Sequence, residues 1–300
     1  MQSHKTVLTD EAIDALAIND SSVVVDATLG SSGHAKRIIE TLGSRGVFVG
    51  IDADLTAITN ATEVLRGSVC ILHLHNGNFR TVDSILEQLH IEHADAILAD
   101  LGWRMEQFSG NGRGFSFQVD EPLLMTFGDP KDYVFTAYDI VNEWDEENII
   151  NILRGYGEER FAGRIARHIV EARAEKPIKT TFELVAVIES AVPAFYKRAR
   201  IHCATRTFQA LRITVNDEFL ALEDFIKKSV ALLSPHGRLA IITFHSIEDR
   251  IVKHLFKNLA HDHIGIVHTK KPIVASPEEL QENPRARSAK LRIFEKHEEV

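Results

Sequence analysis

The chain has very little cysteine and no long hydrophobic run. Its two cysteines, Cys70 and Cys203, are far apart, and neither is part of a Cys-x-x-Cys motif. A disulfide framework and a cysteine zinc site therefore have no support. No stretch approaches the roughly 18 apolar residues that span a bilayer, and the first residues lack the basic-then-apolar run of a signal peptide. These absences predict a cytoplasmic protein without membrane contact.

Positive charge is also scarce, since 34 Lys and Arg face 43 Asp and Glu and the net charge is −9. This balance argues against a general nucleic-acid coat, which is usually basic. It leaves open an enzyme that meets RNA on one local face. The 15 histidines include pairs such as His73/His75, but no acid cluster adjoins them, so we predict no metal site.

Short apolar segments alternate with helical patterns along much of the chain. Two of these segments end in an aspartate directly before a loop, and a third ends in Asp100. Continuous apolar strands that alternate with helices predict an α/β fold, a parallel sheet covered on both faces. The expected strands are Val23–Asp26, Val47–Asp52, Val69–Leu72, Asp95–Asp100 and Arg238–Phe244.

One long interval, between Asp100 and Arg238, interrupts this rhythm. The amphipathic run Asn216–Leu233 supplies the crossover helix before the last strand. The remainder is rich in helical patterns, at Glu146–Leu153, Glu158–Ala174 and Thr181–Ala191. In a chain of 300 residues, one large domain plus a smaller one is expected. We predict a sheet domain of residues 1–104 and 206–300 with a small helical domain, residues 105–205, inserted into it.

The segment from Val23 to Asp52 has the pattern of a nucleotide site. A strand, a glycine-bearing loop and a helix are followed about 20 residues later by an acid that can hold ribose hydroxyls. The loop has Gly30 and Gly33 rather than G-x-G-x-x-G, so the pyrophosphate cradle is incomplete. Asp26 before the loop disfavours a pyrophosphate and suits a cationic ligand such as S-adenosylmethionine, with Asp52 on the ribose. The alternative is a strand–turn–helix connection that binds nothing.

The fourth strand ends in Asp100-Leu101-Gly102-Trp103. Enzymes that methylate exocyclic amines commonly place an Asp/Asn-Pro-Pro-aromatic tetrapeptide there, which accepts hydrogen bonds from the amine and stacks the base. Asp100 and Trp103 match its first and fourth positions, but both prolines are missing. Trp103 is as compatible with packing between the domains as with stacking a base.

Longer motifs over nearly the whole chain give a specific resemblance. In order, they resemble those of the bacterial ribosomal small-subunit RNA (cytosine-N4)-methyltransferases, the RsmH/MraW family. The matching blocks are His4–Leu8, Asp26–Gly30, Gly33-His34, Gly50–Asp54, Arg113–Phe117, Gly155–Arg160, Ala204–Arg212, Phe244–Arg250 and Asn283–Arg292.

This resemblance implies a class I (Rossmann-like) methyltransferase sheet with an inserted helical domain. It also implies S-adenosylmethionine as methyl donor and, as substrate, N4 of a cytosine in the decoding region of 16S ribosomal RNA in the small ribosomal subunit. Asp100 then has a catalytic, polarising role. Without the resemblance, Phe79 is a core residue. The family's donor site falls on Ser32, Gly33, His34, Asp52, Phe79, Asp100 and Gln107.

On the RNA side, the resemblance implies that Arg206, Arg285 and Arg287 bind substrate, and the tetrapeptide pattern makes Trp103 a further substrate-binding candidate. By themselves these arginines favour a solvated face or a set of salt bridges, since 43 acids are available as partners. The chain departs from the family pattern at Ser31-Ser32, Trp103–Glu106 and Leu124–Thr126. Two alternatives therefore stand beside the main hypothesis: the same fold acting on a different RNA or DNA, and a non-catalytic ribosome-assembly factor. The sequence does not determine the oligomeric state.

Overall fold

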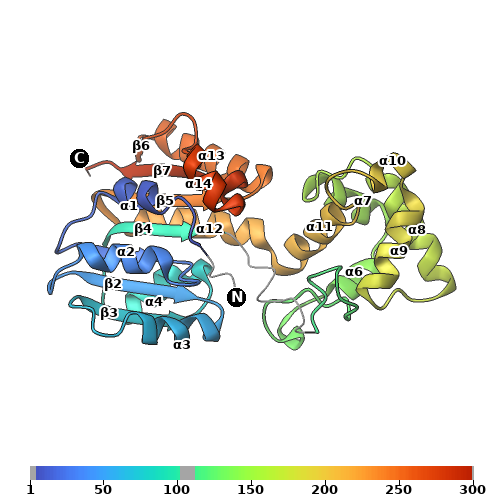
Figure 1. Ribbon diagram of the computed structural model, residues 1–300, viewed down its shortest axis with the longest axis horizontal. Helices are drawn as coiled ribbons and strands as arrows, with labels where there is room; N and C mark the ends of the chain where they lie inside the picture. Colours follow the sequence, from blue (N-terminus) through green and yellow to red (C-terminus); the bar gives the residue numbers. More distant parts are fainter. Residues whose placement is uncertain (1–4, 102–111, 299–300) are drawn as a thin grey trace. The chain divides into compact units, whose positions relative to one another are not determined.

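The computed structural model describes residues 5–101 and 112–298 and divides into two compact units (Figure 1). One unit comprises Met1–Gly102 and Phe219–Val300, and the other comprises Trp103–Glu218. Within the described ranges, no helix has the length and apolar character needed to cross a membrane.

The first unit is built on a seven-stranded sheet of order β3-β2-β1-β4-β5-β7-β6. Its first five strands are parallel, as expected for buried apolar segments joined by helices. The α/β class and the class I methyltransferase arrangement are confirmed. The strands are β1 (Val23–Asp26), β2 (Val47–Asp52), β3 (Ile71–Asn76), β4 (Ala94–Asp100), β5 (Leu233–Thr243), β6 (Gly265–Val267) and β7 (Lys290–Lys296).

Two strands were not expected, and one of them breaks the parallel pattern. β7 pairs antiparallel with β5, for example Ile241 with Arg292, and β6 pairs antiparallel with β7. Lys290–Lys296 mixes charged and apolar residues, so it lacks the continuous apolar run used to find the other strands. The third strand also begins two residues later than predicted, at Ile71.

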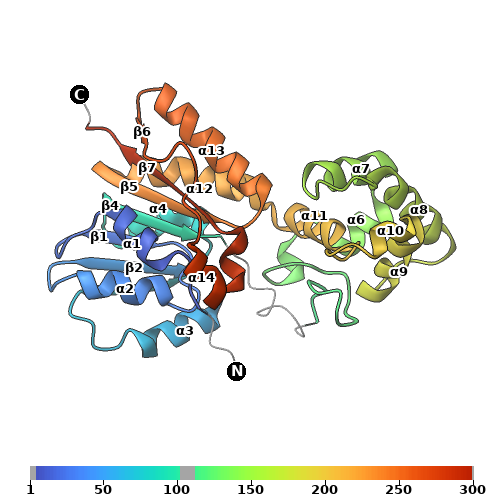
Figure 2. The same ribbon diagram turned by 45° about the horizontal axis from the view of Figure 1, so that its top comes forward.

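Helices cover both faces of this sheet (Figures 1 and 2). Buried residues of α1, α2 and α3 share one apolar cluster with β1, β4 and β5. Helices α4 and α12 lie on the opposite face (Figure 1), and α13 packs on β5, β6 and β7. The helices are α1 (Thr9–Leu16), α2 (Gly33–Thr41), α3 (Leu55–Val64), α4 (Val82–Gln88), α12 (Glu218–Leu232), α13 (Ser246–His261) and α14 (Pro277–Glu282), with short 3-10 turns η1 (Phe79–Thr81) and η3 (Pro284–Ser288).

The second unit is helical and has its own core. Buried side chains from its helices form one apolar cluster that runs from Phe115 to Val215. Its elements are η2 (Pro130–Asp132), α6 (Ala137–Glu143), α7 (Glu146–Gly155), α8 (Ala162–Glu175), α9 (Thr181–Ala191), α10 (Ala194–Lys197) and α11 (Thr205–Asn216).

The end of the inserted unit differs from the sequence-based boundary. Residues from Arg206 onward were assigned to the sheet domain, whereas α11 belongs to the helical unit, which extends to Glu218. The physical reason is packing, since Phe208 and Leu211 of α11 are buried in the helical core and α11 contacts α6 and α7.

Candidate active site

The loop after β1 runs between the carboxyl ends of two neighbouring strands. The backbone N–H of Ala27 donates to the carbonyl of Leu98 on β4 at 2.8 Å, and that of Leu29 donates to Ile51 on β2 at 2.9 Å. The strand order reverses between β1 and β4, because β2 and β3 follow on one side and β4 and β5 on the other. Open α/β sheets bind ligands at such a switch point.

Asp52, at the end of β2, is held by backbone donors. Its Oδ2 accepts a hydrogen bond from the N–H of Gly30 at 2.7 Å, and its Oδ1 accepts one from Asp54 at 2.8 Å. The first bond joins the end of β2 to the loop after β1. The structure therefore brings Asp52 to the loop, where the sequence predicted a ribose-binding acid.

Asp100, at the end of β4, is positioned from both its backbone and its side chain. Its N–H donates to Thr28 Oγ1 at 2.6 Å, and its Oδ2 lies 3.8 Å from His34 Nδ1. His34 Nε2 is 3.0 Å from the carbonyl of Val7; because a carbonyl only accepts, this nitrogen carries a proton. Asp100 keeps 20% of its side chain exposed. Thr28, which sequence reasoning missed, links the loop to Asp100, and its position two residues after Asp26 was the available signal.

Asp26, at the end of β1, is the most deeply buried of the three acids. It is 1% exposed, its Oδ1 accepts a 3.2 Å hydrogen bond from Thr28 N–H, and its Oδ2 has no hydrogen-bond partner within the described residues. Burial raises the pKa of this carboxyl to about 7, a rise to which the charges of Asp100 and Asp52 add. An orphaned buried carboxyl oxygen beside the loop fits a cationic ligand such as S-adenosylmethionine.

Two residues of the loop are constrained: Ser32 has a positive φ, and Gly33 lies close to the side chain of Thr6. Ser32 is buried and has a φ of 64°, a conformation that costs a residue with a Cβ more than it costs glycine. Gly33 begins α2, and a Cβ placed there would lie 2.7 Å from the Cβ of Thr6 and closer still to its hydroxyl. The N-terminal segment therefore packs directly on the loop, and glycine is required for that contact.

The remaining predicted donor residues have different outcomes. Phe79 begins η1, is 8% exposed and packs edge-to-face on Phe225 of α12, with ring centroids 5.3 Å apart. It is largely a core residue that lies next to the end of β3. Gln107 and Trp103 lie outside the described residues.

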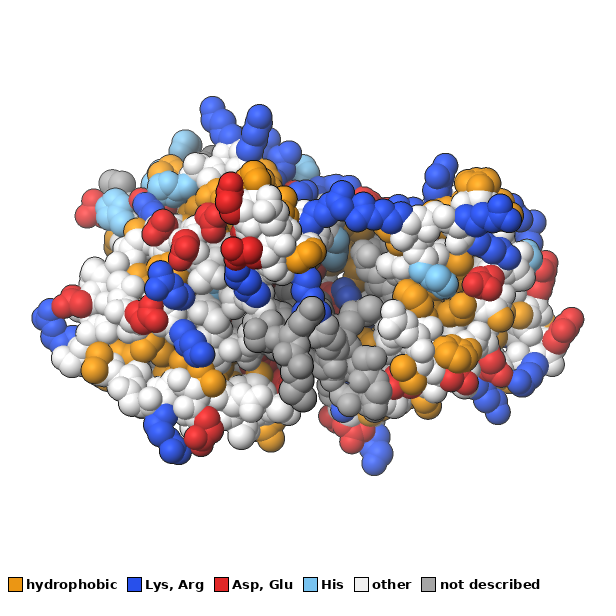
Figure 3. Space-filling view, viewed as in Figure 1, with side chains coloured by type: hydrophobic (Ala, Val, Ile, Leu, Met, Phe, Trp, Pro, Cys, Tyr) orange, Lys and Arg blue, Asp and Glu red, His pale blue; other side chains and the backbone are white. Residues whose placement is uncertain are grey.

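The predicted RNA-side arginines occupy different environments. Arg206 donates to the Tyr196 hydroxyl at 3.2 Å, which in turn donates to Glu159 at 2.7 Å, so it belongs to a polar network inside the helical unit. Arg285 and Arg287 are exposed on η3 of the sheet unit. The structure therefore does not bring the three arginines together in one unit. Figure 3 shows further Lys and Arg side chains gathered over the end of the sheet unit that carries β6 and α13.

Two neighbouring cations of the same sequence block are structural. Arg292, 4% exposed, donates to Asp249 at 2.6 Å, and Lys290 donates to the same carboxylate at 3.1 Å. Burial alone would raise the pKa of Asp249, but hydrogen bonds from Arg292 and Lys290 outweigh it and hold the pKa below its ordinary value. For these two residues the salt-bridge interpretation is correct.

The departure at Leu124–Thr126 lies in the core of the helical unit. Met125 and Thr126 are fully buried. The Asn216 amide donates to the Met125 carbonyl at 2.7 Å, and the Met125 N–H donates to the Arg113 carbonyl at 2.7 Å. This segment is thus fixed by α11 and by the Arg113 backbone.

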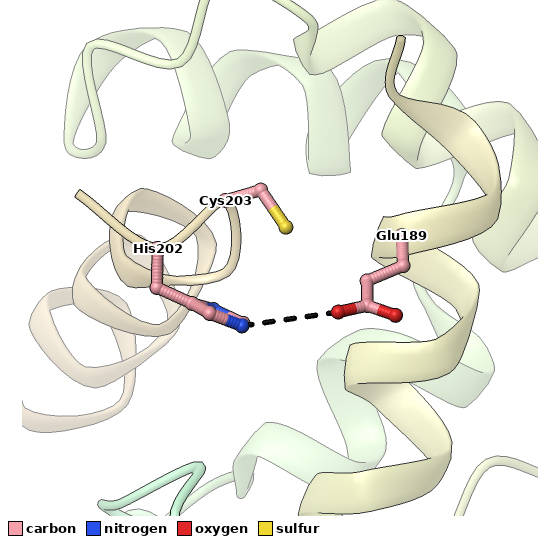
Figure 4. Close-up of side chains that lie close together, drawn as sticks. All are labelled: Glu189, His202 and Cys203. Atoms are coloured by element: carbon pink, nitrogen blue, oxygen red, sulfur yellow. Dashed lines mark ion pairs between the residues drawn. The ribbon is translucent and has the colours of Figure 1, made fainter. Parts of the chain in front are cut away.

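One group of metal-ligand side chains lies in the described part of the helical unit: Glu189 of α9, His202 and Cys203 (Figure 4). His202 Nε2 lies 3.8 Å from Glu189 Oε1, while its Nδ1 accepts the Ala204 N–H at 3.2 Å. A neutral imidazole that accepts at Nδ1 carries its proton on Nε2, so the nitrogen facing Glu189 is a donor. Burial also raises the pKa of the Cys203 thiol. The hydrogen bond of His202 to the backbone before α11 and the packing of Cys203 in the helical core account for this group, and the absence of a metal site stays a prediction.

Known proteins match this chain over nearly its whole length. The model of the MraW methylase family matches residues 1–297. The chain is 46% identical to "Ribosomal RNA small subunit methyltransferase H" of Clostridium botulinum (strain Loch Maree / Type A3), over 98% of each chain. It is 43% identical to the protein of that name from Clostridioides difficile (strain 630), again over 98% of each. A solved structure of an rRNA methylase from Streptococcus thermophilus aligns with a TM-score of 0.45 and 12% identity, covering 97% of this chain and 94% of the other. The family match and the relatives lead to one conclusion: this chain belongs to the MraW methylase family.

Proposed function

We propose that this protein transfers the methyl group of S-adenosylmethionine to N4 of a cytosine in the decoding region of 16S ribosomal RNA. The observation that carries the donor half is the set of three strand-terminal acids, Asp26, Asp52 and Asp100, linked to one loop at the switch point of the sheet. The substrate half is supported by the name of the relatives at 42–46% identity. A small-subunit RNA substrate places the reaction in the cytoplasm.

Apart from Gln107, the residues that hold the donor belong to the sheet unit. Asp52, oriented by the Gly30 and Asp54 N–H groups, accepts hydrogen bonds from the ribose. Ser32, Gly33 and His34 form the turn into α2. Because Gly33 has no side chain, the donor can come close to the backbone of this turn. The remaining donor contacts are Phe79, on the adenine side, and Gln107. Bound S-adenosylmethionine supplies an electrophilic methyl group on a sulfonium.

Asp100 acts at the methyl end of the site. The lone pair of cytosine N4 is delocalised into the ring, so a carboxylate that accepts a hydrogen bond from the amine helps to align and polarise it. His34 Nδ1 lies 3.8 Å from Asp100 Oδ2 and forms an ion pair with it only when the imidazole is protonated. After the N4–carbon bond has formed and the carbon–sulfur bond has broken, the methylated nitrogen releases one proton to the solvent, so Asp100 is not required as a general base. A paired target base has to leave its helix first, at a cost of a few kcal/mol.

The RNA is bound through both units, with Arg285 and Arg287 on the sheet unit and Trp103 and the network around Arg206 on the inserted one. Replacement of an exposed phosphate-binding arginine should weaken RNA binding and reduce its salt dependence by about one ion per residue. Arg285→Ala/Arg287→Ala tests this in RNA-binding assays at several salt concentrations. Arg45→Ala, an exposed arginine at the amino edge of β2, is the matched control.

The decisive experiment maps N4-methylcytosine in 16S ribosomal RNA from cells with and without this protein. We expect one modified cytosine in the decoding region to disappear in its absence and to return with the wild-type chain but not with Asp100→Ala. An unchanged pattern refutes the substrate. RNA binding without measurable S-adenosylmethionine affinity identifies a non-catalytic assembly factor instead.

A further inference from the structure

We propose that the exposed face of α13 binds the phosphate backbone of a double-stranded RNA segment. The inference deepens the proposed function and rests on it in one respect, because it takes the duplex beside the target cytosine as the occupant. It concerns the sheet unit alone. It adds an RNA-binding surface that is separate from Arg285 and Arg287 of η3.

The exposed residues of α13 form one stripe along the helix. They recur every three or four positions, which places them on one side of an α-helix. The other side packs on the sheet through Val252 and Phe256, which are fully buried, and the ring of Phe256 lies 5.4 Å from that of Phe294 on β7. This packing fixes the orientation of the helix, so the stripe points away from the core. The stripe consists of Ser246, Arg250, Lys253, His254, Lys257, Asn258 and His261.

The acids of α13 serve contacts inside the protein. Glu248 and Asp249, in its first turn, are buried. Glu248 accepts a hydrogen bond from the Phe244 N–H at 3.1 Å, and Asp249 accepts one from Arg292 at 2.6 Å. The next acid in the sequence is Asp262, beyond the end of the helix. The stripe therefore carries positive charge that the helix itself does not neutralise.

The lysines of the stripe are available to a ligand. Lys253 and Lys257 are exposed, and neither forms an ion pair with a residue in the described ranges. Lys270 and Lys271, exposed in the segment after β6, extend the positive surface at the same end of the sheet, where Figure 3 shows Lys and Arg side chains gathered. In a chain with a net charge of −9, such a local excess of cations indicates a polyanion as partner.

The length and composition of the stripe favour a nucleic-acid duplex over a single strand. An α-helix rises 1.5 Å per residue, so the cations from Arg250 to His261 extend over about 16 Å. The stripe contains no Phe, Tyr or Trp on which an unpaired base could stack, and Lys side chains that meet phosphates do not read base sequence. Double-stranded RNA presents its phosphates at regular intervals, and proteins recognise it largely through such contacts.

The stripe begins at the edge of the sheet where the donor site lies. α13 starts at Ser246, directly after the end of β5, and Ile242 of β5 is paired with Asp100. The strand that follows α13 is β6, which pairs with Lys296, at the opposite end of β7 from Lys290. The stripe thus runs from the carboxyl edge of the sheet toward its amino edge. An RNA stem bound along it has one end at the edge that carries Asp100, where the target nucleotide can leave the duplex.

Fluorescence anisotropy with labelled synthetic RNA tests this on the full-length protein. One probe is a hairpin with a cytosine in its loop and a stem longer than the stripe, and the other is the loop strand without the stem. We expect the wild type to bind the hairpin about tenfold more tightly than the loop strand at low salt. A hairpin with an unrelated stem sequence should bind equally well, because backbone contacts carry no sequence information.

Lys253→Ala/Lys257→Ala is the key variant, and both side chains are exposed, so the fold should not change. We expect the affinity for the hairpin to fall about tenfold at low salt, and the slope of log affinity against log salt to decrease by about two. Affinity for the loop strand and for S-adenosylmethionine should stay the same. Lys253→Arg/Lys257→Arg should bind like the wild type. Arg45→Ala/Lys227→Ala removes the same charge from other exposed positions of the sheet unit and should leave the slope unchanged.

The outcomes separate this inference from the proposed function. If the key variant binds the hairpin like the wild type, or loses no more affinity than the Arg45/Lys227 control, the inference is wrong while the proposed function stands. An equal loss for hairpin and loop strand would make the occupant a single strand. Polyglutamate or phosphatidylglycerol vesicles that bind the stripe as tightly as the hairpin would assign it to an acidic protein or to a membrane. If the wild type binds neither RNA, the proposed RNA substrate fails, and the inference fails with it.

Discussion

Asp26 and Asp249 are both buried aspartates, but the pKa of Asp26 is raised and the pKa of Asp249 is lowered. Arg292 and Lys290 both hydrogen-bond to Asp249, and its pKa lies below the ordinary value. Asp26 accepts one hydrogen bond, from Thr28 N–H, and has Asp100 and Asp52 nearby. Burial and these two negative charges raise its pKa to about 7. Because its pKa is lowered, the ionised Asp249 carboxylate stabilises the fold relative to the protonated form. Ionisation of a buried carboxyl group without cations beside it lowers the stability of the fold, which is typical of groups that serve a ligand.

Asp26 makes the empty protein less stable as pH rises. Its folded pKa lies above the unfolded value of 3.8, so between these values the folded state binds more protons and stability falls as pH increases, until the loss is complete above about 7. From pH 5 to pH 8 the expected loss is about 2–3 kcal/mol. Urea unfolding over this range should show that loss in the wild type and a much flatter profile in Asp26→Asn. Equal slopes in both proteins would contradict the assignment.

Asp249 should show the reverse pH dependence. Its folded pKa lies below the unfolded value, so its contribution is fully present above the unfolded pKa and is lost as pH falls through the folded one. Asp249→Asn leaves Arg292 buried without its anion and should lower the free energy of unfolding at pH 7 by about 3 kcal/mol. The double variant Asp249→Asn/Arg292→Met should recover part of that loss in urea unfolding. Additive losses would mean that the two side chains are not coupled.

At the scale of elements, the donor loop depends on contacts from both ends of the chain. The N-terminal segment is held by the C-terminal region, through the Glu279 carboxylate on the Leu8 N–H at 2.8 Å and the Asn283 amide on the Lys5 carbonyl at 3.0 Å. Thr6 in that segment packs on Gly33, and Val7 accepts from His34. Elements far apart in the sequence thus set the conformation of the turn into α2.

Gly33→Ala should disrupt this packing. The new Cβ would lie 2.7 Å from the Thr6 Cβ, so the N-terminal segment or the loop has to move. We expect at least a tenfold loss of S-adenosylmethionine affinity, measured by calorimetry, with a smaller effect on thermal stability. Removing the obstructing side chain in Gly33→Ala/Thr6→Gly should restore part of the affinity. No recovery would show that the added methyl group acts on the donor directly.

At the scale of the whole molecule, two separate cores serve two tasks. The sheet unit carries the acids and the loop, whereas the helical unit has its own apolar cluster. The Arg212–Glu218 ion pair, with Nε 2.7 Å from Oε1, lies at the end of the helical unit. A core of this kind is what an independently folding domain requires.

The inserted unit should therefore fold by itself. A fragment of residues 112–218 is expected to show helical circular dichroism and one cooperative thermal transition. Arg206→Met removes the cation from the network with Tyr196 and Glu159 and should lower the midpoint of that transition by several degrees. A fragment that melts without cooperativity would show that its core needs the sheet unit.

The sequence by itself determined most of the sheet unit. The parallel strands were visible because buried parallel strands are continuous apolar runs, and β1 and β2 lie where these runs predicted. Acids at the ends of these strands, next to a glycine-bearing loop, indicated the donor site, because the carboxyl ends of parallel strands meet at one edge of the sheet. Family motifs then supplied residues that no local pattern indicates, such as Phe79, whose burial is otherwise that of a core side chain.

Only the tertiary structure decided what depends on contacts between distant residues. The antiparallel pairing of β7, the assignment of α11 to the helical unit and the pairing of Arg292 with Asp249 each follow from packing partners far away in the sequence. The state of Asp26 belongs to the same group. Its position before the loop was readable, but its pKa depends on how deeply three neighbouring strands bury it and on which side chains stand nearby. The pKa of a side chain depends on its burial and on the charges around it, and both are set by the folded structure rather than by the neighbouring sequence.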